Sequence, residues 1–219
     1  MTRLARIVVP NYPHHIIQRG NRRQKVFFNN QDKIDYLNII KKHAQKSGIE
    51  FWAYCLMDNH VHLIAVPKEE TSLARGIGEA HRNYTSMINN REGWSGYLWQ
   101  GRFLSYPLDE FYLYSAIRYI ENNPVRAGLV EKAEDYLWSS AKSHVSKEKD
   151  ILCCDNFVIS EIKDWSLFLA ERVTDKEINR FKEHTCIGRP FGEEKFLIKL
   201  EKKTGRILRK RKPGPKKNN

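Results

Sequence analysis

The spacing of apolar and polar positions over the first 70 residues predicts a strand, a helix and a hairpin. An apolar run from Ile7 to Gln18, interrupted near two prolines, predicts a first strand that closes at Arg19-Gly20-Asn21. Residues 32–47 place apolar side chains at helical spacing, and Gly48 follows as a stop signal. Two short β-type runs, 51–57 and 60–66, are joined by the turn pair Asp58-Asn59, which predicts a hairpin.

The next 55 residues predict a second helix, a fourth strand and a third helix. The second helix begins near Thr71 or Ser72, and residues 97–106 form the candidate strand. Asp109 caps the third helix, and Pro124 ends it because the residue before a proline is pushed out of helical geometry. This order of elements predicts an α+β fold, a ferredoxin-like antiparallel sheet with helices packed on one face.

The rest of the chain divides by pattern and charge. We expect residues 1–145 to form the main domain, with Trp138 as a packing anchor near its end. Residues 146–198 are expected to be a helical extension, with helical stretches at 165–183 and 193–203.

Charge points to a polyanionic partner. Lys and Arg number 38 against 26 Asp and Glu, which gives a net charge of +12. Residues 199–219 carry ten of the basic residues and one acid, and their Pro-Gly-Pro run denies them regular structure. We interpret them as a flexible nucleic-acid-binding tail that includes Arg209, Lys210, Arg211 and Lys212. The alternative is a solvated tail that aids solubility.

Membrane-spanning, exported and zinc-stabilised proteins are excluded as first interpretations. The longest apolar run has seven residues, at 51–57, far below the roughly 18 that cross a bilayer, and no stretch of signal-peptide type follows the N-terminus. The four cysteines form no CxxC pair, so a structural zinc site is not expected. Unpaired cysteines fit a reduced, cytoplasmic location best.

The sharpest candidate chemistry is His60-Val61-His62. In a strand, residues i and i+2 point to the same face, so both imidazoles project together and can hold one divalent cation. Alone the signal is weak, because histidines alternating with apolar residues are more often solvent-facing or hydrogen-bonded.

The third helix adds a tyrosine and an amide. Leu113, Ile117 and Ile120 define its buried stripe, and Tyr119 lies on a flank about 120° away. Asn123 follows about 40° from Tyr119, so a phenol and an amide oxygen can approach one point. For Tyr112 and Tyr114, on the same helix, we expect packing roles.

Five motifs together resemble one family. Residues 55–64 read Cys-Leu-Met-Asp-Asn-His-Val-His-Leu-Ile, and residues 119–128 read Tyr-Ile-Glu-Asn-Asn-Pro-Val-Arg-Ala-Gly; further matches lie at 18–22, 81–85 and 98–103. In this order they are similar to the REP-associated tyrosine transposases, an IS200-like branch of the HUH (His-hydrophobic-His) single-strand transposases. The resemblance covers roughly residues 5–143, and the HUH fold it implies is ferredoxin-like.

The resemblance implies a site and a reaction. His60 and His62 become metal ligands, Asn123 the third ligand, Tyr119 the nucleophile, and Mg²⁺ or Mn²⁺ the ion. The implied activity is that of a single-stranded DNA endonuclease and strand transferase acting through a covalent 5′-phosphotyrosine intermediate. Such an exchange retains bond energy and needs no nucleotide cofactor, and the chain has no GxxxxGK[ST] loop.

The implied partner is DNA with palindromic hairpins. We expect contacts from a cluster where the first strand ends and from the fourth strand, where basic and aromatic side chains can hold phosphates and stack unpaired bases: Arg19, Asn21, Arg22, Arg23, Trp99 and Arg102. The implied location is cytoplasmic and nucleoid-associated, with a monomer or a homodimer as the working form.

Two alternative functions compete with this interpretation. A histidine-triad phosphotransferase needs a third histidine, but position 64 is isoleucine. The more serious alternative is a domesticated DNA- or RNA-hairpin-binding protein with little or no cleavage activity.

Overall fold

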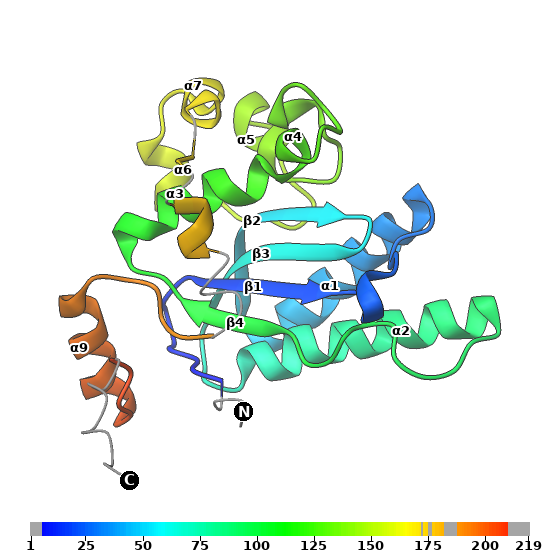
Figure 1. Ribbon diagram of the computed structural model, residues 1–219, viewed down its shortest axis with the longest axis horizontal. Helices are drawn as coiled ribbons and strands as arrows, with labels where there is room; N and C mark the ends of the chain where they lie inside the picture. The colour runs from blue at the N-terminus through cyan, green and yellow to red at the C-terminus, as the bar shows by residue number, and fades with distance from the viewer. Residues whose placement is uncertain (1–5, 172, 175–176, 182–187, 210–219) are drawn as a thin grey trace, which may run out of the picture.

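The fold is built on one four-stranded antiparallel sheet. The computed structural model in Figure 1 describes residues 6–171, 173–174, 177–181 and 188–209. The strands are β1 (His14–Arg19), β2 (Ile49–Met57), β3 (His60–Pro67) and β4 (Leu104–Pro107), in the spatial order β2-β3-β1-β4. The α+β class and the ferredoxin-like antiparallel sheet predicted from the sequence are confirmed.

Several connecting segments of the chain meet at one end of this sheet. Because neighbouring strands are antiparallel, β1 and β2 end where β3 and β4 begin. We call this the hairpin end of the sheet, because it carries the Asp58-Asn59 turn. The 3₁₀ turn η1 (Asn21–Arg23), which follows β1, also lies there, since the amides of Gly20 and Val26 donate to the carbonyls of Asn59 and Asp58.

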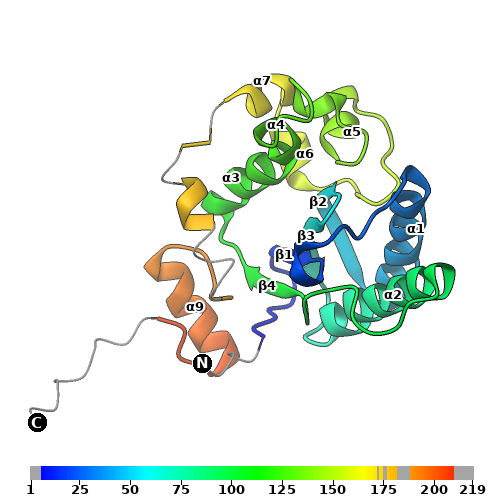
Figure 2. The same cartoon turned by 45° about the vertical axis from the view of Figure 1, so that its right-hand side comes forward.

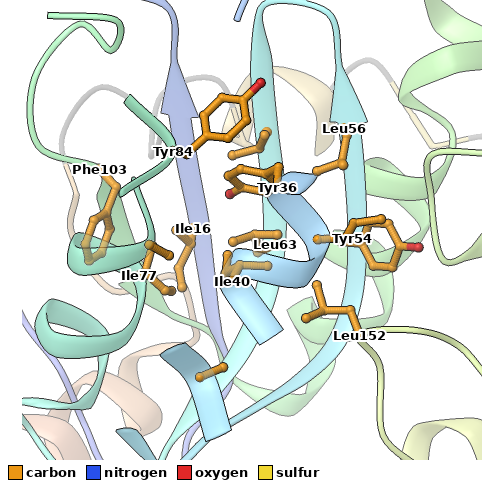
Figure 3. Close-up of a cluster of buried hydrophobic side chains, with 14 of the residues drawn as sticks. Ile16, Tyr36, Ile40, Tyr54, Leu56, Leu63, Ile77, Tyr84, Phe103 and Leu152 are labelled. Carbon is orange, nitrogen blue, oxygen red and sulfur yellow. The ribbon is translucent and has the colours of Figure 1, made fainter. Parts of the chain in front are cut away.

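Two helices cover the first face of the sheet as expected. They are α1 (Asn30–Ser47) and α2 (Glu79–Glu92), with the π-helical turn η2 (Ala74–Gly78) leading into α2. Figure 3 shows Ile16 and Leu63 of the sheet among Tyr36 and Ile40 of α1, all of them buried. These apolar positions recur at helical spacing, which is why the two helices bury this face.

The opposite face is also covered, which corrects the expectation of helices on one face only. There α3 (Glu110–Glu121) packs on Ile17 of β1 and Ile64 of β3, with Leu113 and Ile117 buried (Figure 2). β2 and β3 are almost continuously apolar instead of alternating, and that pattern is typical of strands buried on both faces.

Short elements after α3 extend this second layer. α3 ends at Glu121, and Pro124 lies in the first turn of the next helix, α4 (Asn123–Arg126), where proline is well tolerated. Then follow η3 (Ala133–Asp135), α5 (Ala141–Ser146), α6 (Phe157–Glu161) and α7 (Trp165–Ala170). Val158 and Trp165 join the cluster under α3, so this stretch shares the core of the main domain.

The first and fourth strands are shorter in the structure than the sequence predicts. β1 begins only at His14, because Ile7 and Val9 pack instead on α9 (Glu194–Thr204), beside the N-terminal segment in Figure 2. β4 begins at Leu104, and residues 97–103 form a loop. The helix at 193–203 is confirmed as α9, but it reaches into the expected flexible tail, where Leu200 and Leu208 are buried.

Asp32 should be a strong determinant of stability. Its carboxylate is fully buried, accepts from the amides of Phe28 and Asn29 at the start of α1, and pairs with Arg91 of α2. Burial raises the pKa of Asp32, but the Arg91 hydrogen bond and the amides outweigh it and hold the pKa below its usual value.

We expect Asp32→Ala to lower the free energy of unfolding by about 3 kcal/mol, because it removes a capping box and takes away the buried carboxylate partner of Arg91. Urea unfolding at pH 7 measures this. Asp35→Ala, on the same helix, is the matched control with an expected change under about 0.5 kcal/mol. Equal losses in both variants would contradict the prediction.

Candidate functional site

His60 and His62 project together from the start of β3, on the face that α3 covers. Their ring centroids are 5.0 Å apart, while Val61 between them is buried in the core under α1 and α2. Register pairs His60 with Arg19 and His62 with Ile17. The two imidazoles therefore share a face, as the strand period predicts.

Tyr119 of α3 lies against this pair. The centroid of its ring is 6.0 Å from that of His62 in the same chain. The guanidinium of Arg126 lies 4.1 Å from the ring centroid, and the Phe181 ring is stacked on it at 4.9 Å. Tyr119 is only 8% exposed as a result.

Hydrogen bonds orient both histidines in the same way. The Nδ1 atom of His60 lies 2.6 Å from Oδ1 of Asn59, whose own Nδ2 donates to the carbonyl of Arg23. Nδ1 of His62 lies 2.9 Å from Nε2 of His15, whose Nδ1 is 2.7 Å from the Tyr106 hydroxyl. Each Nδ1 is engaged, so Nε2 is the nitrogen that remains for a ligand.

Asn123 is the first residue of the next helix, α4, and is linked to Tyr119 through Arg126. Its Oδ1 accepts from Arg126 at 2.5 Å, and its Nδ2 is buried without a hydrogen-bond partner among the described residues. Arg126 also donates to the carbonyl of Tyr119 at 2.8 Å. Arg126 thus ties the candidate nucleophile to the candidate third ligand.

The site favours neutral imidazoles. Burial, assisted by Arg19 and Arg126, lowers the pKa of His60 to about 4. Burial also lowers the pKa of His62 well below its usual value, with His60, His15 and the two arginines adding to the effect. A neutral imidazole is the form that binds a metal.

The donor set fits a divalent ion. Two neutral imidazoles with open Nε2 atoms and an amide oxygen would supply three ligands from His60, His62 and Asn123. Within the described ranges, no group of three or more His, Cys, Asp or Glu side chains could hold a metal ion.

The expected DNA-contact residues fall into three groups. Arg22, Arg23 and Arg102 are exposed, and Arg19 and Asn21 are half-buried at the hairpin end of the sheet. Arg209 is exposed but paired with Glu201 and Glu194. Lys210, Arg211 and Lys212 lie outside the described residues.

The prediction that Trp99 contacts DNA is wrong. It is 6% exposed and packs against His81, Tyr36 and Tyr84 in the core between α1 and α2. A buried indole in this position cannot stack on a base at the surface.

Three residues of the site were missed from the sequence. Arg126 was within the motif at 119–128 but received no role. His15 and Asn59 contact the two histidines; Asn59 lies within the motif at 55–64, whereas His15 belongs to none of the five motifs. The position of His15 two residues before Ile17 places it on the α3 face of β1, which is the signal that could have found it.

Buried histidines predict acid lability. Burial lowers the pKa of His14 to about 4 and that of His81 to about 3, both away from the candidate ligands. As the pH falls, these histidines take up protons in the unfolded chain at a higher pH than in the folded protein. The free energy of unfolding is therefore greatest above about pH 6.5 and decreases as the pH falls toward 4.

Between pH 7 and pH 5 we expect the free energy of unfolding to fall by at least about 2 kcal/mol. His144 contributes with the opposite sign: burial lowers its pKa, but the Glu121 carboxylate outweighs burial and raises it overall. Urea unfolding at both pH values tests this, and His81→Gln, which cannot titrate, should flatten the slope. Equal stability at pH 7 and 5 would refute the assignment.

Comparisons with known proteins point to one family. The model of the IS200-like transposase family matches residues 8–123. A protein of Haemophilus influenzae described as a REP-associated tyrosine transposase is 28% identical over 130 residues, which cover 52% of this chain and 73% of that protein. The solved structure of a REP-associated tyrosine transposase bound to a REP hairpin has a TM-score of 0.55 at 18% identity and covers 80% of this chain and 100% of that one, a likeness of fold.

In the part of the chain that the structure describes, no helix is long and apolar enough to cross a membrane.

Proposed function

Because the chain belongs to the IS200-like transposase family, we propose that it is a metal-dependent enzyme that cuts and rejoins single-stranded DNA beside hairpins. The observation that carries the proposal is the approach of Tyr119 to the His60–His62 pair, with a ring separation of 6.0 Å from His62. A phenol beside two neutral imidazoles and an accessible arginine is a suitable set for covalent phosphoryl transfer.

In the proposed step, the phenolic oxygen of Tyr119 attacks the phosphorus of a phosphodiester. The new bond is tyrosine O–P, and the bond that breaks is P–O3′, whose electron pair stays on the 3′ oxygen. The phenolic proton goes to solvent and the 3′ oxygen takes one up, so atoms and charge balance. Attack by another 3′-hydroxyl reverses the step and joins strands.

His60, His62 and Asn123 would hold Mg²⁺ or Mn²⁺, which would supply Lewis-acid polarisation of the phosphate. Asn59 and His15 keep the two Nε2 atoms facing the site. Arg126 has no carboxylate partner within ion-pair distance among the described residues and stays accessible to solvent, so it can bind a phosphate oxygen beside Tyr119.

The proposed partner is hairpin DNA with an unpaired flank. Support comes from the fold likeness to a protein solved with a REP hairpin and from the exposed Arg22, Arg23 and Arg102. Tyr119 and its histidine pair meet within one chain, so a monomer holds a complete candidate site, and a homodimer is not needed for it. Because DNA is the proposed partner, we also propose that the protein is associated with the nucleoid.

One observation favours a second function, hairpin binding with little cleavage. Tyr119 is nearly covered, because Phe181 stacks on its ring. In a protein that binds hairpins without cutting them, the Phe181 ring would stay stacked on Tyr119 when DNA is bound.

The test is a denaturing gel with labelled single-stranded hairpins drawn from palindromes flanking the gene, in Mn²⁺ and in EDTA. The proposal predicts a slow protein–DNA band that needs the metal. Tight hairpin binding with no such band would favour the binding-only function.

His15 should matter for metal binding although it is not a ligand. We expect His15→Ala to weaken Mn²⁺ binding about 10- to 100-fold, because His62 loses the hydrogen bond that holds its Nε2 toward the site. Isothermal titration with Mn²⁺ measures this without DNA, and His15→Gln, which keeps an acceptor, should recover part of the affinity. Unchanged affinity in a folded His15→Ala protein would contradict this role.

A further inference from the structure

Three large aromatic side chains are exposed on two segments of the chain that contact each other. Phe28 is 41% exposed, Trp94 48% and Tyr97 85%. Trp94 packs edge-on against Phe28, with ring centroids 5.6 Å apart. We call these three residues the aromatic platform.

The platform lies at the hairpin end of the sheet. Trp94 and Tyr97 belong to the loop that leads from α2 into β4, and Phe28 follows η1, the turn after β1. The amide of Asn21 in η1 donates to the carbonyl of Leu98, next to Tyr97, at 2.8 Å. The loop and the turn are therefore in direct contact.

The backbone around Tyr97 is fixed on both sides. Asn89 of α2 donates from Nδ2 to the carbonyl of Gly96 at 3.0 Å, and the Leu98 carbonyl accepts from Asn21 and from the side chain of Gln24. Gly96 has a φ of +94°, which favours glycine. The phenol ring is thus held in solvent by an anchored loop, and binding needs little ordering of the backbone.

Two arginines beside the platform are unpaired, whereas the nearby acids are paired with other cations. Arg22 and Arg23 are exposed and have no carboxylate within ion-pair distance among the described residues. Both hold left-handed backbone, with φ of 50° and 63°, an arrangement that the amide of Arg23 secures by donating to Gly20. Nearby, Asp58 pairs with Lys25 and Lys33, and Glu92 pairs with Arg91.

We propose that the aromatic platform, with Arg22 and Arg23, binds the unpaired strand next to a DNA hairpin by stacking its bases. Unpaired cations suit phosphates, and exposed rings suit bases whose faces are free, whereas paired bases in a stem offer no face. Arg19 lies between the two: it is paired in register with His60, and its carbonyl accepts from the amide of Gln100, in the same loop as Trp94 and Tyr97. The inference rests on the proposed function only in taking DNA as the substrate.

The test measures binding by a protein that cannot form the adduct. In a Tyr119→Phe background, fluorescence anisotropy compares a stem-loop carrying a single-stranded thymine flank with the same stem-loop without it. Stacking tolerates any base, so the natural target sequence is not needed. A 2-aminopurine in the flank reports stacking by its quenching.

We expect Trp94→Ala/Tyr97→Ala to weaken binding of the flanked hairpin about tenfold or more, to abolish the quenching, and to leave the blunt hairpin unaffected. Tyr97→Phe should keep the quenching, because the ring remains. The matched control is Phe111→Ala, a 70% exposed aromatic in the first turn of α3, which follows β4 at the opposite end of the sheet.

The proposal is overturned if the double variant binds the flanked hairpin as tightly as the Phe111→Ala control. It is also overturned if both hairpins weaken equally, or if the background protein does not distinguish them. Failure of the proposed function looks different: the protein with Tyr119 intact forms no adduct, while the effect of the double variant on binding persists.

Discussion

Tyr119→Phe will leave the protein folded and remove the covalent protein–DNA product. The loss should be at least about a thousandfold in the rate of adduct formation, because no other group can take over the role of a missing nucleophile. The ring keeps its contacts with Arg126 and Phe181, so the free energy of unfolding should change by less than about 1 kcal/mol. Denaturing gels and urea unfolding measure the two quantities.

Two tyrosines of the same helix are the matched controls. The hydroxyl of Tyr112 accepts from Arg180, and that of Tyr114 is bonded to Glu161, so both have structural partners away from the histidine pair. Tyr112→Phe and Tyr114→Phe should keep adduct formation within about threefold. An adduct that survives Tyr119→Phe but disappears in either control would show that the nucleophile is misassigned.

Removing one histidine ligand should have the second-largest effect. We expect His60→Ala to slow adduct formation at least about a hundredfold and to abolish tight Mn²⁺ binding, since an ion that stabilises transition-state charge contributes several kcal/mol. EDTA should have the same effect on the parent protein. His60 is the better choice for the variant because it is half-buried, whereas His62 is 4% exposed.

His43 is the control for this prediction. It bonds to Asn83 on the surface between α1 and α2, on the other face of the sheet, and His43→Ala should change neither metal affinity nor rate. Full activity of His60→Ala in EDTA would show that the histidine pair has no metal role.

Local rules were enough to predict most of the elements and the faces on which His60, His62 and Tyr119 lie, while the roles of these residues came from the family resemblance. The strand period placed His60 and His62 on one face, and helical spacing placed Tyr119 on a flank of α3, where the structure brings it to His62. Those predictions depend on covalent geometry within one element. The turn at Asp58-Asn59 likewise needed only local residue preferences.

The errors came from contacts between distant parts of the chain. Ile7 and Val9 look like strand residues, but α9 supplies the apolar surface that buries them. Trp99 looked like a stacking residue because it lies near Arg102 in the expected fourth strand, yet α1 and α2 enclose it. The platform residues Trp94 and Tyr97, in the same loop, were not singled out, since nothing local distinguishes an exposed tryptophan from a buried one.

The residues that orient the site were beyond sequence patterns for the same reason. His15 reaches His62 only through the pairing of β1 with β3, and Asn59 is directed by the carbonyl of Arg23. Arg126 reaches Tyr119 because the chain breaks the helix at Asn122 and begins α4.

The most direct measurement identifies the residue that carries the DNA. The covalent product is digested with trypsin and nuclease, and the nucleotide-bearing peptide is sequenced by mass spectrometry. Cleavage after Arg118 and Arg126 releases Tyr119 in the peptide 119–126, while Tyr106, Tyr112 and Tyr114 fall in 103–118. We predict the nucleotide on Tyr119 in peptide 119–126; a nucleotide on 103–118, or on any other peptide, would contradict the central claim.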